Sequence, residues 1–324
     1  GQLAAVAGAG RIAVRSEHVE APTMKRAQGT AHVSLRNILL ATDFSHSSDA
    51  ALAHAASIAR RYDAKMFVAH VIRPDVYQLV PPEVTTITLE QTRRYAEQQM
   101  AGLLISGRLR DIPHQVLLGT GELWPVLSEL LGQHEIDLIV VGTHGRTGVR
   151  KLLLGSAAEE IFRMASCPVL TVGPKVEVPE GAALAPDPLS RRRFLYATDF
   201  TAHSERAAAY AVSLAQENQA HLTLLHVVQE SAEVSEHNRA RMVEFFNKRL
   251  RALLPDEAEM WCEPEIIVEF GEPADTILKV ARETQAEVIA LGVRRAGTFP
   301  GHLPPATAYK VVCQATCPVL TVRG

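Results

Sequence analysis

A run of glycines that ends in a serine is the part of this sequence best suited to chemistry. Gly142, Gly145 and Gly155 precede Ser156, with two residues between the first pair and nine between the second. Glycines let a backbone come close to an anion, and a helix that begins at the serine would point free N–H groups at it. The spacing therefore favours phosphate binding, although it is neither the dinucleotide fingerprint nor the lysine-bearing P-loop.

The residues on either side of this glycine loop predict the elements that position it. The run 136–141 is apolar except for Asp137, which is typical of a buried parallel strand. After the loop, residues 157–165 have apolar side chains at helical spacing. A strand, a glycine loop and a helix start, in this order, make the local architecture that holds a phosphate group.

Composition bounds the classes of partner. The chain has 324 residues, which suggests about two domains of ordinary size. A net charge of −3 without a polybasic run argues against nucleic acid as a partner. No apolar run approaches the ~20 residues of a membrane span, so we expect no membrane partner either. The 47% hydrophobic content is typical of a soluble globular protein.

Cysteine usage points to a reducing compartment. No CxxC pair occurs, so the sequence indicates neither a zinc site nor a disulfide framework. We therefore expect a cytoplasmic protein. The four cysteines are Cys167, Cys262, Cys313 and Cys317.

Strands and helices alternate along the first half, which implies a doubly wound parallel sheet. Ligands of such sheets bind beyond the carboxyl ends of the strands. Asp43, Val71 and Gly142 all stand at predicted strand ends. The first expected strand begins at residue 37, and the next four cover 65–72, 114–118, 136–141 and 167–172. The expected helices cover 47–62, 88–108, 123–133 and 157–165.

The pattern of the first half is repeated in the second. Ala197–Phe200 repeats Ala41–Phe44 at an offset of 156, and 317–322 repeats 167–172 at an offset of 150. A repeat of this length is a duplicated domain and not a solenoid. We predict a mobile tail over 1–33, a first domain over 34–174, a proline-rich linker over 175–190 and a second domain over 191–324.

The second copy lacks the features that suit phosphate. At an offset of 150 the four loop residues correspond to Gly292, Arg295, Pro305 and Ala306. Proline has no N–H to donate and alanine has no hydroxyl. The second copy should therefore keep the fold but carry a degenerate nucleotide site.

The long, fixed spacing of the glycine loop resembles the nucleotide-binding signature of the universal stress protein family, in its ATP-binding branch. The resemblance covers about 34–173 and 190–323, and the signature is complete only in the first copy. It implies two tandem doubly wound parallel five-stranded sheets, which are Rossmann-like and similar to the adenine nucleotide alpha hydrolases. It also implies ATP with Mg²⁺ as ligand, and a stress-response regulator or sensor with a regulatory protein partner.

The same resemblance implies a set of binding residues. In the ATP-binding branch the strand-one Asp and its neighbours contact the nucleoside, and the residue after the strand-two His contacts the base through its backbone. The glycine loop and its serine hold the ribose and phosphates. Carried over by match, the set is Ala41, Thr42, Asp43, Val71, Val141, Gly142, His144, Gly145, Arg146, Gly155, Ser156 and Ala157. Ala41 departs from the frequent proline at its position, and a backbone contact survives that change.

Several of these residues also have a plainer interpretation. Ser156 and Glu159 have the spacing of a capping box, which would explain the serine without a ligand. Asp43 could orient the turn into the first helix, since Asp199 persists in the copy that lacks the loop. His70 and its repeat His226 are expected to pack in their strands.

No catalytic constellation is evident, so an enzymatic activity beyond weak ATP hydrolysis is not expected. Three functions remain open: an ATP-binding regulator, a protein-interaction scaffold that binds no nucleotide, and a slow ATPase. The short apolar strands 169–172 and 319–322 end their copies and leave an edge to be covered. They can pair within one chain, which we favour, or between two chains of a homodimer.

Overall fold

A computed structural model describes residues 33–73, 82–143, 154–176, 192–229, 236–256, 258, 264–294 and 306–323, with side chains of the second helix from residue 87 onward. Most of the predicted tail and of the linker lies outside these residues. Val33 is described, and its backbone N–H donates to the Ser213 hydroxyl of the second half at 2.8 Å. The predicted domain boundaries stay predictions.

The first half alternates strands and helices as expected, with one start misplaced. Helix α2 begins at Pro82 and not near residue 88, because proline is well suited to the first turn of a helix, where its missing N–H costs no hydrogen bond. The elements are β1 Asn37–Ala41, α1 His46–Tyr62, β2 Lys65–Ile72, α2 Pro82–Ile105, β3 His114–Thr120, α3 Leu123–Gln133, β4 Leu138–Gly142, α4 Ser156–Met164 and β5 Val169–Val172.

The second half repeats this order, as the duplicated sequence predicts. Its first helix is capped like α1: the Thr201 hydroxyl accepts from the Ser204 N–H, as the Ser45 hydroxyl accepts from the Ser48 N–H. The elements are β6 Arg193–Ala197, α5 Ala202–Asn218, β7 His221–Val228, α6 Glu236–Arg251, β8 Glu265–Phe270, α8 Pro273–Glu283, β9 Val288–Val293, α9 Ala306–Gln314 and β10 Val319–Arg323.

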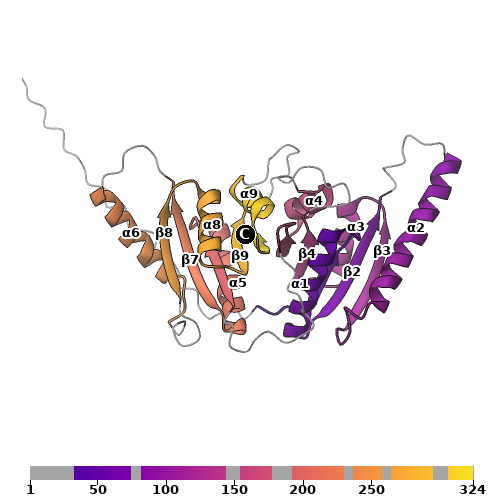
Figure 1. Cartoon of the computed structure of the whole chain (residues 1–324), viewed down its shortest axis with the longest axis horizontal. Helices are drawn as coiled ribbons and strands as arrows, with labels where there is room; N and C mark the ends of the chain where they lie inside the picture. The colour runs from indigo at the N-terminus through magenta and orange to yellow at the C-terminus, as the bar shows by residue number, and fades with distance from the viewer. Residues whose placement is uncertain are drawn as a thin grey trace, which may run out of the picture.

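The strands form one sheet of ten, in the order β3-β2-β1-β4-β5-β10-β9-β6-β7-β8. Within each half all pairs are parallel, which confirms that each half has a doubly wound parallel sheet of five strands, and the two are joined edge to edge in the single larger sheet. The halves meet where β5 and β10 pair antiparallel, with Leu170 opposite Leu320. We call this pairing the seam, and it lies at the centre of the molecule (Figure 1).

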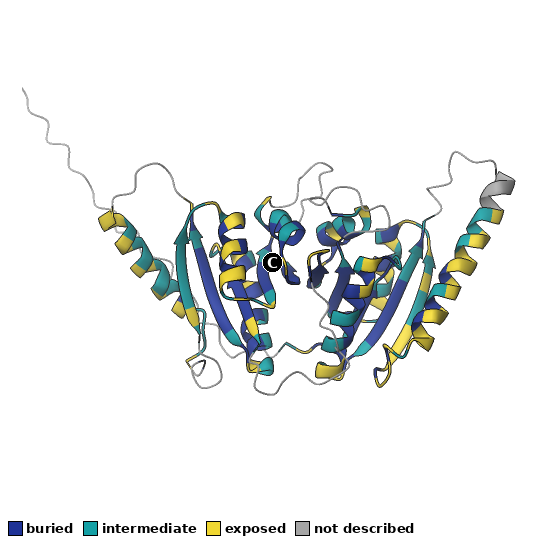
Figure 2. Cartoon of the chain, viewed as in Figure 1, coloured by how far each residue is buried: buried dark blue, intermediate teal, exposed yellow. Residues whose placement is uncertain are grey.

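Apolar side chains cover both faces of the sheet, as parallel strands require. Alternate residues of β1 point to opposite faces: Ile38 packs on the side of α1 and α2, and Leu39 on the side of α3 and α4. Each of the two core clusters contains residues from both halves. The inner strands are accordingly buried, while the outward faces of the helices are exposed (Figure 2). No helix among the described residues is long and apolar enough to cross a membrane.

The seam generates the first prediction. Leu320→Lys places an ammonium group against Leu170, in a position where the leucine is now 3% exposed. If a specific protease site is placed between 177 and 190 and cut, the wild-type halves should stay together on a sizing column, whereas the Leu320→Lys halves should separate.

The matched control is Leu104→Lys, because Leu104 of α2 is 43% exposed and distant from the seam. Its cut halves should co-elute like those of the wild type. Free separation of the cut wild-type halves would show that the pairing does not hold them together.

Candidate functional site

The predicted site residues gather where the direction of chain progression reverses. From β1 the chain moves outward through β2 to β3, then α3 returns it to β4 on the other side of β1. The carboxyl ends of β1 and β4 lie side by side, with Ala41 paired to Val141. A doubly wound sheet binds its ligands at this topological switch point.

Nine of the twelve predicted binding residues fall in the described part of the chain. His144, Gly145 and Arg146 lie outside it. The other nine occupy the ends of β1, β2 and β4 and the start of α4, so the fold brings the predicted segments to one edge of the sheet.

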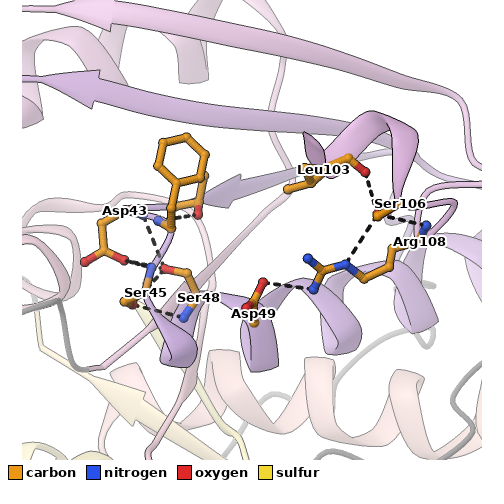
Figure 3. A network of polar contacts seen from close by, with 9 residues as sticks. Asp43, Ser45, Ser48, Asp49, Leu103, Ser106 and Arg108 are labelled. Carbon is orange, nitrogen blue, oxygen red and sulfur yellow. Dashed lines mark hydrogen bonds and ion pairs between the residues drawn. The ribbon is translucent and has the colours of Figure 1, made fainter. Parts of the chain in front are cut away.

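Asp43 organises the turn from β1 into α1 (Figure 3). Its Oδ1 accepts from the Ser45 N–H at 3.0 Å and from the Ser48 hydroxyl at 2.7 Å. Burial acts to raise the pKa of Asp43, but these hydrogen bonds outweigh it and hold the pKa below its ordinary value. Phe44 takes a left-handed conformation with φ of 62°, which lets the chain turn sharply into the helix.

The second half builds the same turn without the glycine loop. Asp199 Oδ1 accepts from the Thr201 N–H at 3.0 Å and from the Ser204 hydroxyl at 2.5 Å, and Phe200 has φ of 58°. Because the network is equivalent in both halves, the geometry supports the plainer interpretation, in which Asp43 orients the turn into α1.

Val71 presents its backbone to the same edge. The Ala69 carbonyl accepts from the Thr42 N–H at 2.9 Å, on the β1 side of β2. Backbone polar groups two residues apart in a strand point the same way, so those of Val71 also face the β1 side. The register with β1 ends at Ala69, whereas β2 continues to Ile72. Val71 thus faces the space beyond the end of β1.

In each half, the histidine of the second strand contacts the backbone at the end of the first strand. Nδ1 of His70 lies 2.7 Å from the Thr42 carbonyl oxygen, and Nδ1 of His226 lies 2.8 Å from that of Thr198. Each ring also lies against a phenylalanine at the end of strand one. The ring centroids of His70 and Phe44 are 4.6 Å apart, and those of His226 and Phe200 are 4.8 Å apart. Because both halves have these contacts, we interpret them as structural. This agrees with the expectation from the sequence that both histidines pack in their strands.

Aromatic and cationic side chains from α6 cover this position in the second half. The ring of Phe246 lies 4.1 Å from that of His226 and 5.7 Å from that of Phe200, and Arg249 lies over Phe200 at 4.0 Å. In the first half, by contrast, Phe44 and Thr42 line a pocket between α1 and α2. The two strand ends therefore differ in what lies over them.

Gly142 has a packing role that the sequence interpretation missed. A Cβ atom on Gly142 would lie 2.7 Å from the backbone carbon and oxygen of Ser47, and one on Gly292 would lie 2.4 Å from Cα of Ser204. The first turn of α1, or of α5, thus sits directly on the glycine. The signal was present in the sequence, because Gly292 persists in the copy that lacks the other loop residues.

The two ends of the glycine loop are tied together. The Gly155 N–H donates to the Thr143 carbonyl at 2.7 Å, and Thr143 is fully buried beside β5. Gly155 is the N-cap of α4 with φ of −61°, and no side chain caps the helix. Ser156 is the first helical residue and is exposed, so it is not the N-cap and the capping-box interpretation is wrong.

The start of α4 is consequently suited to an anion. The first N–H groups of a helix have no acceptor within the helix, and here they belong to Ser156 and Ala157 and their successors. The Ser156 hydroxyl stands exposed beside them. An oxygen-rich anion at this point could accept from several donors at once.

The second half also contacts this loop. The Tyr309 hydroxyl of α9 accepts from the Leu154 N–H at 3.3 Å, immediately before Gly155. Burial, together with the negative field of Glu159, raises the pKa of Tyr309, so the phenol is neutral at physiological pH. Nothing in the sequence indicates this contact, because it depends on the seam that brings α9 beside the first half.

Other chemistry is weakly supported in the described part of the chain. No group of three or more His, Cys, Asp or Glu side chains there could hold a metal ion. Burial raises the pKa of Cys167 to about 11 and that of Cys317 to about 12. These thiols stay protonated near neutral pH and are poor nucleophiles.

Comparisons with known proteins agree with this architecture. The model of the family described as the universal stress protein family matches residues 34–173 and 190–323. A curated protein of Staphylococcus aureus, named as a universal stress protein, is 31% identical over 145 residues, which is 43% of this chain and 85% of that protein.

Two solved structures resemble the whole tandem. The crystal structure of a universal stress protein from Archaeoglobus fulgidus has a TM-score of 0.63 at 20% identity, covering 89% of this chain and 98% of that one. A protein from Pseudomonas aeruginosa, named in the same way, has a TM-score of 0.55 at 17% identity, covering 90% and 95%. At these identities the likeness is one of fold.

The close approach at Gly142 generates the second prediction. Gly142→Ala and Gly292→Ala should each destabilise the protein by about 1–3 kcal/mol, the usual cost of forcing atoms into a packed contact. Urea unfolding followed by circular dichroism measures the effect.

The control is Gly102→Ala in the middle of α2, where an added Cβ meets nothing within 4 Å. This change should stabilise by about 0.5–1 kcal/mol, because alanine loses less backbone entropy than glycine in a helix. An unfolding midpoint for Gly142→Ala equal to that of the wild type would contradict the packing role.

Proposed function

This chain belongs to the universal stress protein family, as a tandem of two copies, and we propose that its first half binds ATP and makes the protein a stress-response regulator or sensor. One observation carries the proposal: the complete glycine loop begins and ends at the switch point between β1 and β4. There the Thr143–Gly155 hydrogen bond places Ser156 at the same edge of the sheet as Asp43.

The described residues fit the parts of ATP. The first N–H groups of α4 and the Ser156 hydroxyl are donors for phosphate oxygens. The backbone of Val71 faces the space beyond β1 and offers both a donor and an acceptor to a base. His144, Gly145 and Arg146 would complete the loop, and Ala41, Thr42, Val141 and Ala157 would line the edge.

Two features of the second half support a role for it that does not involve nucleotide binding. Ala306 has no hydroxyl at the start of α9, and the end of β6 lies under Phe246 and Arg249. We propose that this half stabilises the first through the seam and through the contact of Tyr309 with Leu154. The intramolecular β5–β10 pairing would then be the state in solution, and association of whole chains would use other surfaces.

Binding without efficient turnover is the activity that this site supports best. Asp43 is a carboxylate at the switch point, but it accepts two hydrogen bonds that orient α1. We therefore assign it a structural role and not a catalytic one. A regulator of this kind would signal by the difference between its nucleotide-bound and free states. Turnover of bound ATP on the scale of minutes would instead favour the slow ATPase.

The third prediction concerns stoichiometry. Titration of the full chain with Mg–ATP in a calorimeter should give about one site per chain, because only the first half carries the complete loop. A fit to two equivalent sites would show that the second half is not degenerate. No saturable heat would favour the scaffold function.

The fourth prediction concerns the end of the loop. Gly155→Val should abolish ATP binding without unfolding the protein, because valine accepts the observed φ of −61° and ψ of 150° but places a branched side chain beside the phosphate donors. Ser156→Ala should weaken binding by about 1–2 kcal/mol, the scale of one hydrogen bond to a charged group.

Ser34→Ala serves as the control, since Ser34 is exposed and precedes β1 at the opposite end of that strand. It should bind ATP like the wild type. If Gly155→Val and Ser156→Ala keep the wild-type affinity, the start of α4 does not hold the nucleotide.

A further inference from the structure

A cavity lies between the two halves, on the face of the sheet that α1 and α5 cover. It contains about 750 Å³ of empty space, with the solvent at its mouth included. Leu170 and Leu320, which face each other across the seam, form part of its lining. Ile58 of α1 in the first half and Leu214 of α5 in the second half also line it. We call it the seam cavity.

The apolar lining of the seam cavity repeats across the two halves. At the offsets of the sequence repeat, Ile58 corresponds to Leu214, Leu138 to Val288, Pro168 to Pro318 and Leu170 to Leu320. The cavity therefore spans the approximate two-fold axis that relates the copies. A duplication that preserves apolar residues of this kind on both sides provides an apolar container.

The polar lining has diverged between the halves. His54 corresponds to Tyr210, and Tyr62 corresponds to Asn218, at the offset of 156. The Asn218 side-chain amide donates to the Tyr62 hydroxyl at 3.3 Å, which joins the two halves at the cavity wall. The apolar lining is thus similar on the two sides of the cavity, whereas the polar groups differ. Such a lining favours one ligand bound in one orientation.

His54 has an unsatisfied nitrogen at this cavity. Its Nε2 atom is buried and has no hydrogen-bond partner among the described residues. Burial, aided by the positive charge of Arg192, lowers the pKa of His54 to about 4, so the ring is neutral at physiological pH. A buried polar atom without a partner is costly, so a water or a ligand that supplies the missing hydrogen bond would be stabilised there.

The charged lining is positive. Arg61 and Arg192 both line the cavity, and no carboxylate is among its lining residues in the described chain. Arg61 donates to a neutral acceptor, the Glu217 backbone carbonyl, at 2.6 Å. Beyond the effect of burial, the charge of Glu217 raises the pKa of Tyr62 and that of Asp137 raises the pKa of Tyr210. Neither carboxylate lines the cavity, however. The charge balance of the lining thus suits an anion.

We propose that the seam cavity binds a small amphipathic anion, with a carboxylate or sulfonate head on a compact apolar body. The head lies toward Arg192 and His54, and the body packs on Leu170 and Leu320. This site is separate from the ATP site, because it lies against the α1 and α5 face of the seam, whereas ATP is placed beyond the carboxyl ends of β1 and β4. The proposal does not depend on ATP binding.

The test compares three probes that share one chain length, octanoate, octanol and octylammonium, titrated into the full chain in a calorimeter. Octanoate should bind at one site per chain, and octylammonium should not bind. Arg192→Gln should weaken octanoate roughly tenfold, as expected for the loss of a charged partner. Arg36→Gln is the matched control, since Arg36 corresponds to Arg192 in the first half but does not line the cavity.

A second variant fills the space instead of removing the charge. Leu214→Trp should abolish octanoate binding while the melting temperature and the response to ATP stay unchanged. If this variant unfolds, Ile58→Phe makes the same test from the first half, where Ile58 corresponds to Leu214. The proposal is overturned if octanoate shows no saturable binding at millimolar concentration, if octanol binds equally well, or if Arg192→Gln and Arg36→Gln have the same effect.

Discussion

The antiparallel pairing of β5 with β10 is the interaction on which the rest of the structure depends. Each half is a parallel sheet whose last strand would otherwise expose unpaired backbone groups along one edge. The pairing satisfies those groups, and the Thr171 and Thr321 hydroxyls add bonds to the Val319 and Val169 carbonyls. It also merges the cores of the two halves and brings Tyr309 to the first half's loop. In the described chain the open edge of each half is thus covered by the other half.

Duplication has left the two halves alike in scaffold and unlike in surface. The scaffold features recur: the Asp43 and Asp199 turns, the histidine ties, and a glycine under the first helix of each half. The features that differ are at the glycine loop, over the end of strand one, and in the seam cavity. Residues that hold a turn or a close backbone approach are constrained by geometry in every copy. Residues that would only contact a ligand carry no such constraint.

This contrast changes the interpretation of the glycine signature. Gly142 belongs to the signature, yet its missing side chain is required by the backbone of Ser47, whether or not a nucleotide is present. Gly155 is different, because its φ of −61° suits any residue and its place is at the exposed start of α4. The signature therefore contains a residue required for packing, Gly142, beside residues that we propose contact the nucleotide, and the proposed ATP site depends mainly on the latter.

The sequence by itself determined the local elements, the duplication and the parallel order of each half. Periodicity, capping residues and turn residues depend on neighbours close along the chain, and so β2 and α3 coincide with their predicted ranges. The strand ends that carry most of the described site segments could also be predicted, whereas the alternative of a capping role for Ser156 is wrong and the packing role of Gly142 was not foreseen. The seam register, the Tyr309 contact and the cavity with its unpaired His54 appear only in the tertiary structure. They join residues about 150 positions apart, and no local pattern along the chain records such a contact.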